Sequence, residues 1–65
     1  MLEKYDGHEI VVGATNGNIF RGKVIDYITE ADSEDGRDSI VLRDRSTGKL
    51  IELYEEDIKT IDIIK

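Results

Sequence analysis

The chain contains no cysteine, no proline and no tryptophan, and His8 is its one histidine among 65 residues. Without cysteine no disulfide can form, and with a single histidine the sequence predicts neither a metal centre nor another cofactor. The sequence also offers few residues for a catalytic set of nucleophile, base and orienting group, because His8 lies between Gly7 and Glu9 in a segment without other reactive side chains. Glycine patterns that cradle phosphates or dinucleotides are also missing. We therefore expect a protein that is not an enzyme.

Long apolar runs are missing as well. No stretch approaches the roughly 20 apolar residues that a membrane-spanning helix needs. The opening residues include Glu3 and Lys4 and lack the apolar segment of a signal peptide. We expect no membrane partner and a cytoplasmic location.

Length and charge limit the remaining classes. A chain of 65 residues predicts one domain, 1–65, with a small core that a partner subunit would help to stabilise. The net charge is −6, with acidic clusters at 30–38 and 52–57 and a mildly basic stretch at 43–49. An acidic surface repels phosphate backbones. These features favour a protein partner over RNA.

Five short segments rich in β-branched residues alternate with glycine-containing turns. The expected strands are 8–15, 19–28, 39–43, 50–54 and 60–64. Asn16-Gly17 predicts a hairpin between the first two strands, and residues 55–57 predict a 3₁₀-like turn. The spacing of Leu2 and Tyr5 predicts one helical turn at the N-terminus. The pattern predicts an all-β fold, a small five-stranded barrel or sandwich.

The second strand is long and contains Gly22, which we interpret as the point where the strand bends. Period-two alternation places Phe20, Gly22 and Val24 on one face, and it places Ile25 and Tyr27 on the other. The predicted core comprises Leu2, Tyr5, Ile10, Val12, Phe20, Val24, Ile40, Leu42, Ile51, Leu53, Ile58, Ile61 and Ile63.

The run Gly17-Asn18-Ile19-Phe20-Arg21-Gly22-Lys23-Val24 resembles the first motif of Sm-like proteins. Gly17, Phe20, Gly22 and Val24 match its turn glycine, aromatic, second glycine and aliphatic positions. The resemblance implies a five-stranded small SH3-like (Sm-like) barrel with a short N-terminal helical turn. The stretch Ile51–Ile58 also resembles the last part of the C-terminal domain of the bacterial ribosome maturation factor, which implies a role in protein binding or assembly.

The base-binding positions of the Sm-like motifs are changed in this chain. Ile28 stands where the family has an aspartate, and Asp38 and Ser39 stand where it has an asparagine. Tyr54-Glu55 replaces the arginine–glycine pair of the second motif. The resemblance therefore implies the barrel without its RNA site, and we expect a protein-interaction or scaffold module of unknown specific role.

An alternative is an Sm-like RNA-binding protein that uses a basic patch on the second to fourth strands. The patch and its candidate stacking aromatics comprise Arg21, Lys23, Arg43, Arg45, Lys49, Tyr27 and Tyr54. The competing interpretation is that the cations only neutralise Asp26, Asp44 and Glu52 across neighbouring strands.

Two further features bear on binding. The acidic loop 30–38 does not fit a calcium-binding EF-hand, because Ala31 and Leu42 fall at positions that need carboxylates; a weak cation site or a solvated loop are the alternatives. Self-association, as a homodimer or higher oligomer, is expected through the fourth and fifth strands, as in Sm-like barrels. The residues assigned to that contact are Leu50, Glu52, Tyr54, Asp62 and Ile64.

Overall fold

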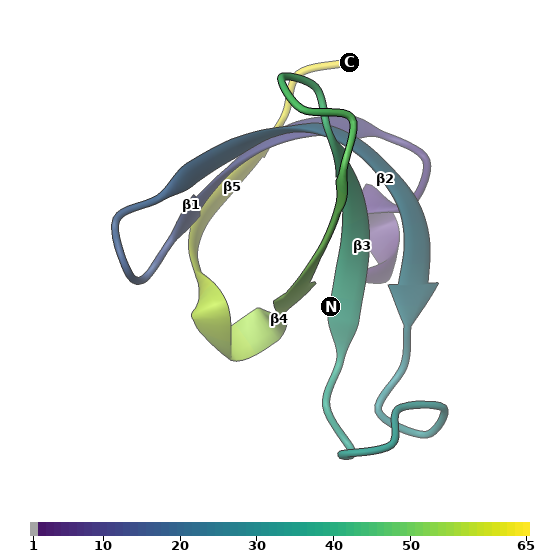
Figure 1. The fold of residues 1–65 in the computed structure, drawn as a ribbon. Coiled ribbons are helices and arrows are strands. Elements are labelled where there is room, and N and C mark those ends of the chain that lie inside the picture. Colours follow the sequence, from purple (N-terminus) through teal and green to yellow (C-terminus); the bar gives the residue numbers. More distant parts are fainter. Residues whose placement is uncertain (1) are drawn as a thin grey trace.

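In the computed structural model, which describes residues 2–65, the chain forms one antiparallel sheet of five strands (Figure 1). The elements are η1 (Glu3–Tyr5), β1 (Glu9–Ala14), β2 (Ile19–Ile28), β3 (Ser39–Asp44), β4 (Leu50–Tyr54), η2 (Glu55–Asp57) and β5 (Ile58–Ile63). The strand order is β4-β3-β2-β1-β5. The prediction of an all-β chain with a short helical turn at its N-terminus is confirmed. Neither 3₁₀ helix within residues 2–65 is long enough to cross a membrane.

The sheet is strongly curved but open. β4 and β5 form its two edges, and they are joined in sequence by η2 rather than by strand pairing. Figure 1 shows the curvature, with β1 and β5 on one side and β2 and β3 on the other. Hydrogen bonding between the described strands therefore does not close the sheet into the barrel that we expected.

β2 is the central strand, and it serves two partners in turn. Its first half pairs with β1 from Ile19 to Lys23, and its second half pairs with β3 from Gly22 to Ile28. Gly22 belongs to both ladders. A Cβ atom on Gly22 would lie 1.9 Å from the carbonyl oxygen of Arg43, so only glycine allows β3 to approach this closely.

A β-bulge follows two residues later and changes which side chains face inward. The β2–β3 register shifts between Val24 and Asp26, which leaves Ile25 without a partner on β3. Beyond the bulge the alternation is inverted, so Tyr27 packs against the core. The prediction that Tyr27 shares the outer face with Ile25 was wrong, because strict period-two alternation does not allow for an inserted residue.

The core lies inside the curve of the sheet. Its buried residues are Leu2, Ile10, Val12, Val24, Ile40, Leu42 and Leu53, with Tyr5, Phe20, Tyr27, Ile51, Ile58 and Ile61 packed partly buried around them. Ala14 is also buried and was not expected. Ile63 was expected in the core but is 46% exposed, because it lies at the end of the edge strand β5.

Candidate functional site

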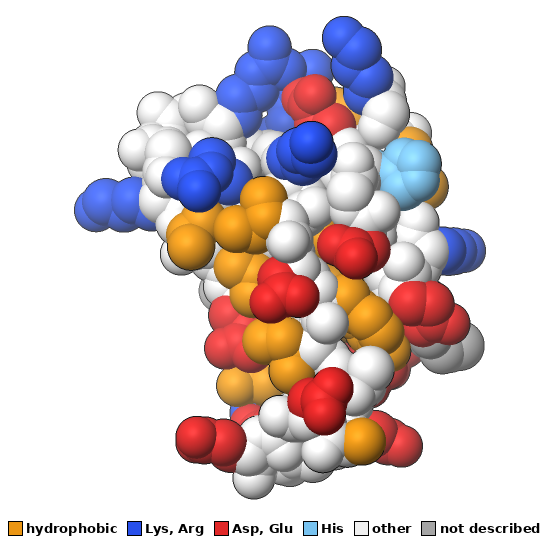
Figure 2. Space-filling view, turned by 90° about the vertical axis from the view of Figure 1, so that its right-hand side faces the viewer, with side chains coloured by type: hydrophobic (Ala, Val, Ile, Leu, Met, Phe, Trp, Pro, Cys, Tyr) orange, Lys and Arg blue, Asp and Glu red, His pale blue; other side chains and the backbone are white. Residues whose placement is uncertain are grey.

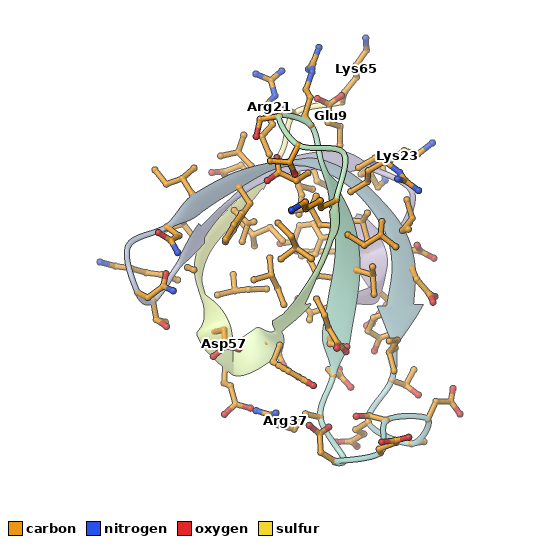
Figure 3. The ribbon with its side chains drawn as sticks, in the orientation of Figure 1. Glu9, Arg21, Lys23, Arg37, Asp57 and Lys65 are labelled. Carbon is orange, nitrogen blue, oxygen red and sulfur yellow. The ribbon has the colours of Figure 1, made fainter. Side chains whose placement is uncertain are left out.

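Charged side chains are separated between the two ends of the molecule. Figure 3 places Arg21, Lys23, Glu9 and Lys65 at one end and Arg37 and Asp57 at the other. We call the first end the basic apex; its charged residues are Arg21, Lys23, Arg43, Arg45, Lys49 and Lys65, with Glu9 and Asp44. Six basic side chains against two carboxylates give it a net side-chain charge of +4 in a chain of −6.

The opposite end is strongly acidic. We call it the acidic base; it comprises residues 30–38 and 55–57, which carry eight carboxylates against the guanidinium of Arg37, a net of −7. The backbone N–H of Glu55 donates to the carbonyl of Asp38 at 3.1 Å, and Arg37 Nη1 donates to Glu56 Oε1 at 3.0 Å. Figure 2 shows the same separation on one face, with blue side chains gathered at the top and red ones at the bottom.

Glu9 orients two of the cations at the basic apex. One oxygen, Oε2, accepts hydrogen bonds from Arg45 Nη1 at 2.8 Å and from Arg21 Nε at 3.4 Å. Arg21 reaches Glu9 from β2, and Arg45 reaches it from the β3–β4 turn. Because each guanidinium carries five N–H donors, both retain donors for a ligand.

Lys23 on β2 and Arg43 on β3 have no acidic partner among residues 2–65. They lie directly opposite each other on β2 and β3, an arrangement of like charges that disfavours strand pairing. Neither forms an ion pair within residues 2–65, and Arg43 Nη1 donates to the carbonyl of Gly48 at 3.1 Å. A hollow of about 280 Å³ lies beside them, and its lining is Glu9, Gly22, Lys23, Arg43, Asp44, Arg45 and Gly48.

The carboxylates that could have neutralised these cations accept hydrogen bonds from other polar groups instead. Asp26 Oδ1 accepts the backbone N–H of Tyr27, and Glu52 Oε2 accepts the hydroxyl of Ser39 at 2.8 Å. Asp44 Oδ1 accepts both the N–H and the hydroxyl of Ser46 at 2.9 Å, which lowers the pKa of Asp44. The predicted cations do come together, and Glu9 is the carboxylate that pairs with two of them, Arg21 and Arg45.

The two tyrosines expected in the basic patch lie elsewhere. The hydroxyl of Tyr27 donates to Asp38 Oδ2 at 3.1 Å, and desolvation together with that carboxylate raises the pKa of Tyr27 to about 12. The Tyr54 ring is covered by the guanidinium of Arg37 at 3.7 Å from its centroid. Both rings belong to the acidic half of the molecule, so no aromatic from the predicted set is placed to stack bases beside Lys23 and Arg43.

The acidic loop is ordered by its own side chains. Asp35 accepts hydrogen bonds from the hydroxyl of Ser33 and from Arg37, and these contacts lower the pKa of Asp35 to about 2. Asp38 Oδ1 accepts the N–H of Glu30 at 2.8 Å. Among the described residues, no three potential ligands lie close enough together to hold a metal ion.

The edge strand β4 presents backbone groups that β3 does not use. The N–H of Asp44 donates to the carbonyl of Lys49, and the N–H of Glu55 donates to that of Asp38, so both pairs are hydrogen-bonded positions of the ladder. Such positions alternate in an antiparallel pair. The outward-facing backbone groups of β4 are therefore those of Leu50, Glu52 and Tyr54.

β4 also lacks most of the features that protect sheet edges. It contains no proline and no lysine, its pairing with β3 has no register shift, and Leu50 is 54% exposed. The other edge, β5, carries Lys59 and Asp62 and pairs with β1 through an irregularity at Gly13/Ala14. Of the five residues predicted for self-association, Leu50, Glu52 and Tyr54 lie on the less protected edge, while Asp62 lies on β5 and Ile64 just beyond it.

Sequence reasoning did not assign roles to Glu9, Arg37 or Ser39. Glu9 contacts Arg21 and Arg45, and Arg37 contacts Glu56 besides the nearby Asp35. The contacts between distant segments leave no local pattern in the sequence. Ser39 is fully buried at the start of β3, where its hydroxyl bonds Glu52. His8, the one histidine of the sequence, is exposed at the entry to β1.

Comparison of the chain with protein-family models, curated proteins and solved structures gives no match.

Proposed function

We propose that this chain is a non-enzymatic small barrel of the SH3-like, Sm-like class that binds another protein through the sheet edge formed by β4. The strand order, the curvature of the sheet and the 3₁₀ turn between β4 and β5 support the barrel assignment. Self-association through the β4 edge is one form of this function.

The observation that carries this proposal is the unprotected edge of β4. The outward N–H and C=O groups of Leu50, Glu52 and Tyr54 form a row that an extended strand can pair with. Side chains on the outer face of β4 would then contribute specificity, because they alternate with the core residues Ile51 and Leu53.

A variant that blocks the edge tests the proposal. Leu50→Pro removes one outward N–H without removing a hydrogen bond to β3, so the fold should survive. We expect proteins captured from native lysate by the wild type to be lost with Leu50→Pro and retained with the control Lys59→Gln on β5. Amide exchange at Leu50, Glu52 and Tyr54 should slow on binding of the captured protein. Equal capture by both variants, or no protection of these amides, would contradict edge binding.

RNA binding at the basic apex is the second candidate function, and it is favoured by Lys23 and Arg43, which form no ion pair within residues 2–65. Fluorescence titration with short uridine- and adenine-rich RNA at two salt concentrations separates the candidates. Binding that weakens steeply with salt and is lost in Lys23→Gln/Arg43→Gln, but not in Lys59→Gln, would favour RNA. Without aromatics at the apex, we expect this binding to depend on phosphate charge and hardly on base identity.

A further inference from the structure

We propose that β4 pairs antiparallel with β4 of a second copy, so that the basic apex of each copy lies against the acidic base of the other. The result is a two-fold symmetric dimer with one continuous sheet across both chains. This inference rests on the proposed function, because it names a second copy as the protein that occupies the β4 edge.

The order of charges along β4 selects the antiparallel arrangement. Lys49 precedes the strand at the basic apex, and Glu55, Glu56 and Asp57 follow it directly at the acidic base. In an antiparallel β4–β4 pair that places Leu50 opposite Glu52, Lys49 of each copy lies opposite Leu53 of the other and is a diagonal neighbour of Glu55. If both copies pointed the same way, the apex of +4 would meet another apex and the base of −7 would meet another base. Charge complementarity therefore favours a closed dimer over a ring of equally oriented subunits.

The backbone of β4 also allows this pairing. The outward groups belong to Leu50, Glu52 and Tyr54, so hydrogen-bonded pairs between copies must join two of these residues. A register that places Leu50 opposite Glu52 meets this condition at both symmetric positions. It also avoids placing the two Glu52 carboxylates directly opposite each other, where like charges would destabilise the pair.

The occupant is a second copy rather than a different protein because the two charged ends complement each other. In a two-fold symmetric β4–β4 pair, the apex of each copy contacts the base of the other, so the apex–base contact occurs twice in the dimer. Leu50, exposed in the single chain, becomes covered in the same step. For a chain of 65 residues without disulfides, this extra burial adds to a small core.

Sedimentation analysis with salt variation is the first test. We expect a species of twice the chain mass of 7.4 kDa at low salt. Raising the salt from about 0.01 M to about 1 M shortens the Debye length from about 30 Å to about 3 Å and should weaken the dimer about tenfold. A mass that stays at 7.4 kDa up to high protein concentration at low salt would overturn the proposal.

Paired charge reversals test the orientation. Lys49→Glu and Glu55→Lys each place like charges at both symmetric contacts, so each variant alone should dimerise about tenfold more weakly. An equimolar mixture should regain the wild-type affinity as a heterodimer, because each new charge then meets an opposite one. Lys59→Glu, with the same change of charge on β5, is the control and should dimerise like the wild type. Single reversals that leave the dimer unchanged would overturn the antiparallel arrangement.

The distance between labels on the two copies gives an independent check. Because the chain contains no cysteine, a single cysteine for labelling can be introduced at a chosen position. A mixture of copies labelled at Lys49→Cys and at Glu55→Cys should report a shorter distance between copies than two labels at Lys49→Cys. The reverse order would overturn the proposal. If the chain is monomeric but Leu50→Pro still abolishes capture of another protein, the proposed function stands and the dimer alone fails.

Discussion

The carbonyl oxygen of Arg43 occupies the space that a side chain on Gly22 would need. A Cβ built there lies 1.9 Å from that oxygen and 2.8 Å from its carbonyl carbon, both backbone atoms of β3. β2 can therefore pair with β1 and β3 around the same residue only while that residue is glycine.

Gly22→Ala should lower the free energy of unfolding by about 1–3 kcal/mol or more, because the backbone of β3 must move to admit the methyl group. Gly13→Ala is the matched control. Its Cβ would meet only side-chain atoms of Thr60, the hydroxyl oxygen at 2.6 Å, and that exposed side chain can rotate away. Urea denaturation of both variants measures the difference. Equal losses would show that the β3 backbone yields easily at Arg43.

Two neighbours on β3 should respond very differently to truncation. Leu42 is fully buried, so Leu42→Ala should cost about 2–5 kcal/mol, a loss that comparable small domains can hardly tolerate. Val41 lies on the outer face and is only partly buried, so Val41→Ala should cost clearly less. Circular dichroism during thermal unfolding should show Leu42→Ala largely unfolded and Val41→Ala folded; the opposite ranking would contradict the assignment of faces.

Tyr27 should make the protein sensitive to alkali. Its pKa is raised from 10.0 to about 12 by desolvation and by Asp38. A raised pKa means that the neutral phenol is favoured in the folded state, so its contribution is complete below pH 10 and is lost as the pH rises towards 12. Stability measured across this range should fall in the wild type and fall less in Tyr27→Phe. Ultraviolet absorbance should show that Tyr27 ionises at a higher pH than an ordinary phenol.

Arg37 should hold the acidic loop in place through Asp35, Glu56 and the Tyr54 ring. Arg37→Ala should increase fast backbone motion across residues 30–38, seen as lower ¹⁵N heteronuclear NOE values. Lys59→Ala removes a cation that forms no ion pair or ring contact within residues 2–65, and it should leave the loop unchanged. If the loop stays rigid in Arg37→Ala, the carboxylate–hydroxyl contacts within it are sufficient.

Acid should loosen the same loop. The pKa of Asp35 is lowered from 3.8 to about 2 by Ser33 and Arg37, so its contribution is complete above pH 3.8 and is lost as the pH falls towards 2. In Asp35→Asn this acid dependence should disappear. Loop chemical shifts followed by NMR through this range provide the measurement, and identical titrations of the two proteins would contradict the role of Asp35.

The amino-acid sequence by itself determined the strands and their turns. Period-two apolar alternation and the Asn16-Gly17 signal are local, and β2 and β4 begin and end at the predicted residues. Gly17 has a φ of 92°, as its turn requires. The interpretation of Gly22 as a bend likewise used only the pattern within a single strand. The prediction that Lys23 and Arg43 cluster required the second and third strands to be neighbours, and the structure pairs these strands with Lys23 directly opposite Arg43.

Only the tertiary structure decided which residues meet across distant segments. The bulge after Val24 turned Tyr27 inward to Asp38, and Glu9 joined Arg21 to Arg45 although it precedes Arg45 by 36 residues. The separation of charge into a basic apex and an acidic base is likewise invisible along the chain. Local patterns report the backbone's preferences over a few residues, whereas these contacts depend on strand register and curvature, which the packing of the whole core sets.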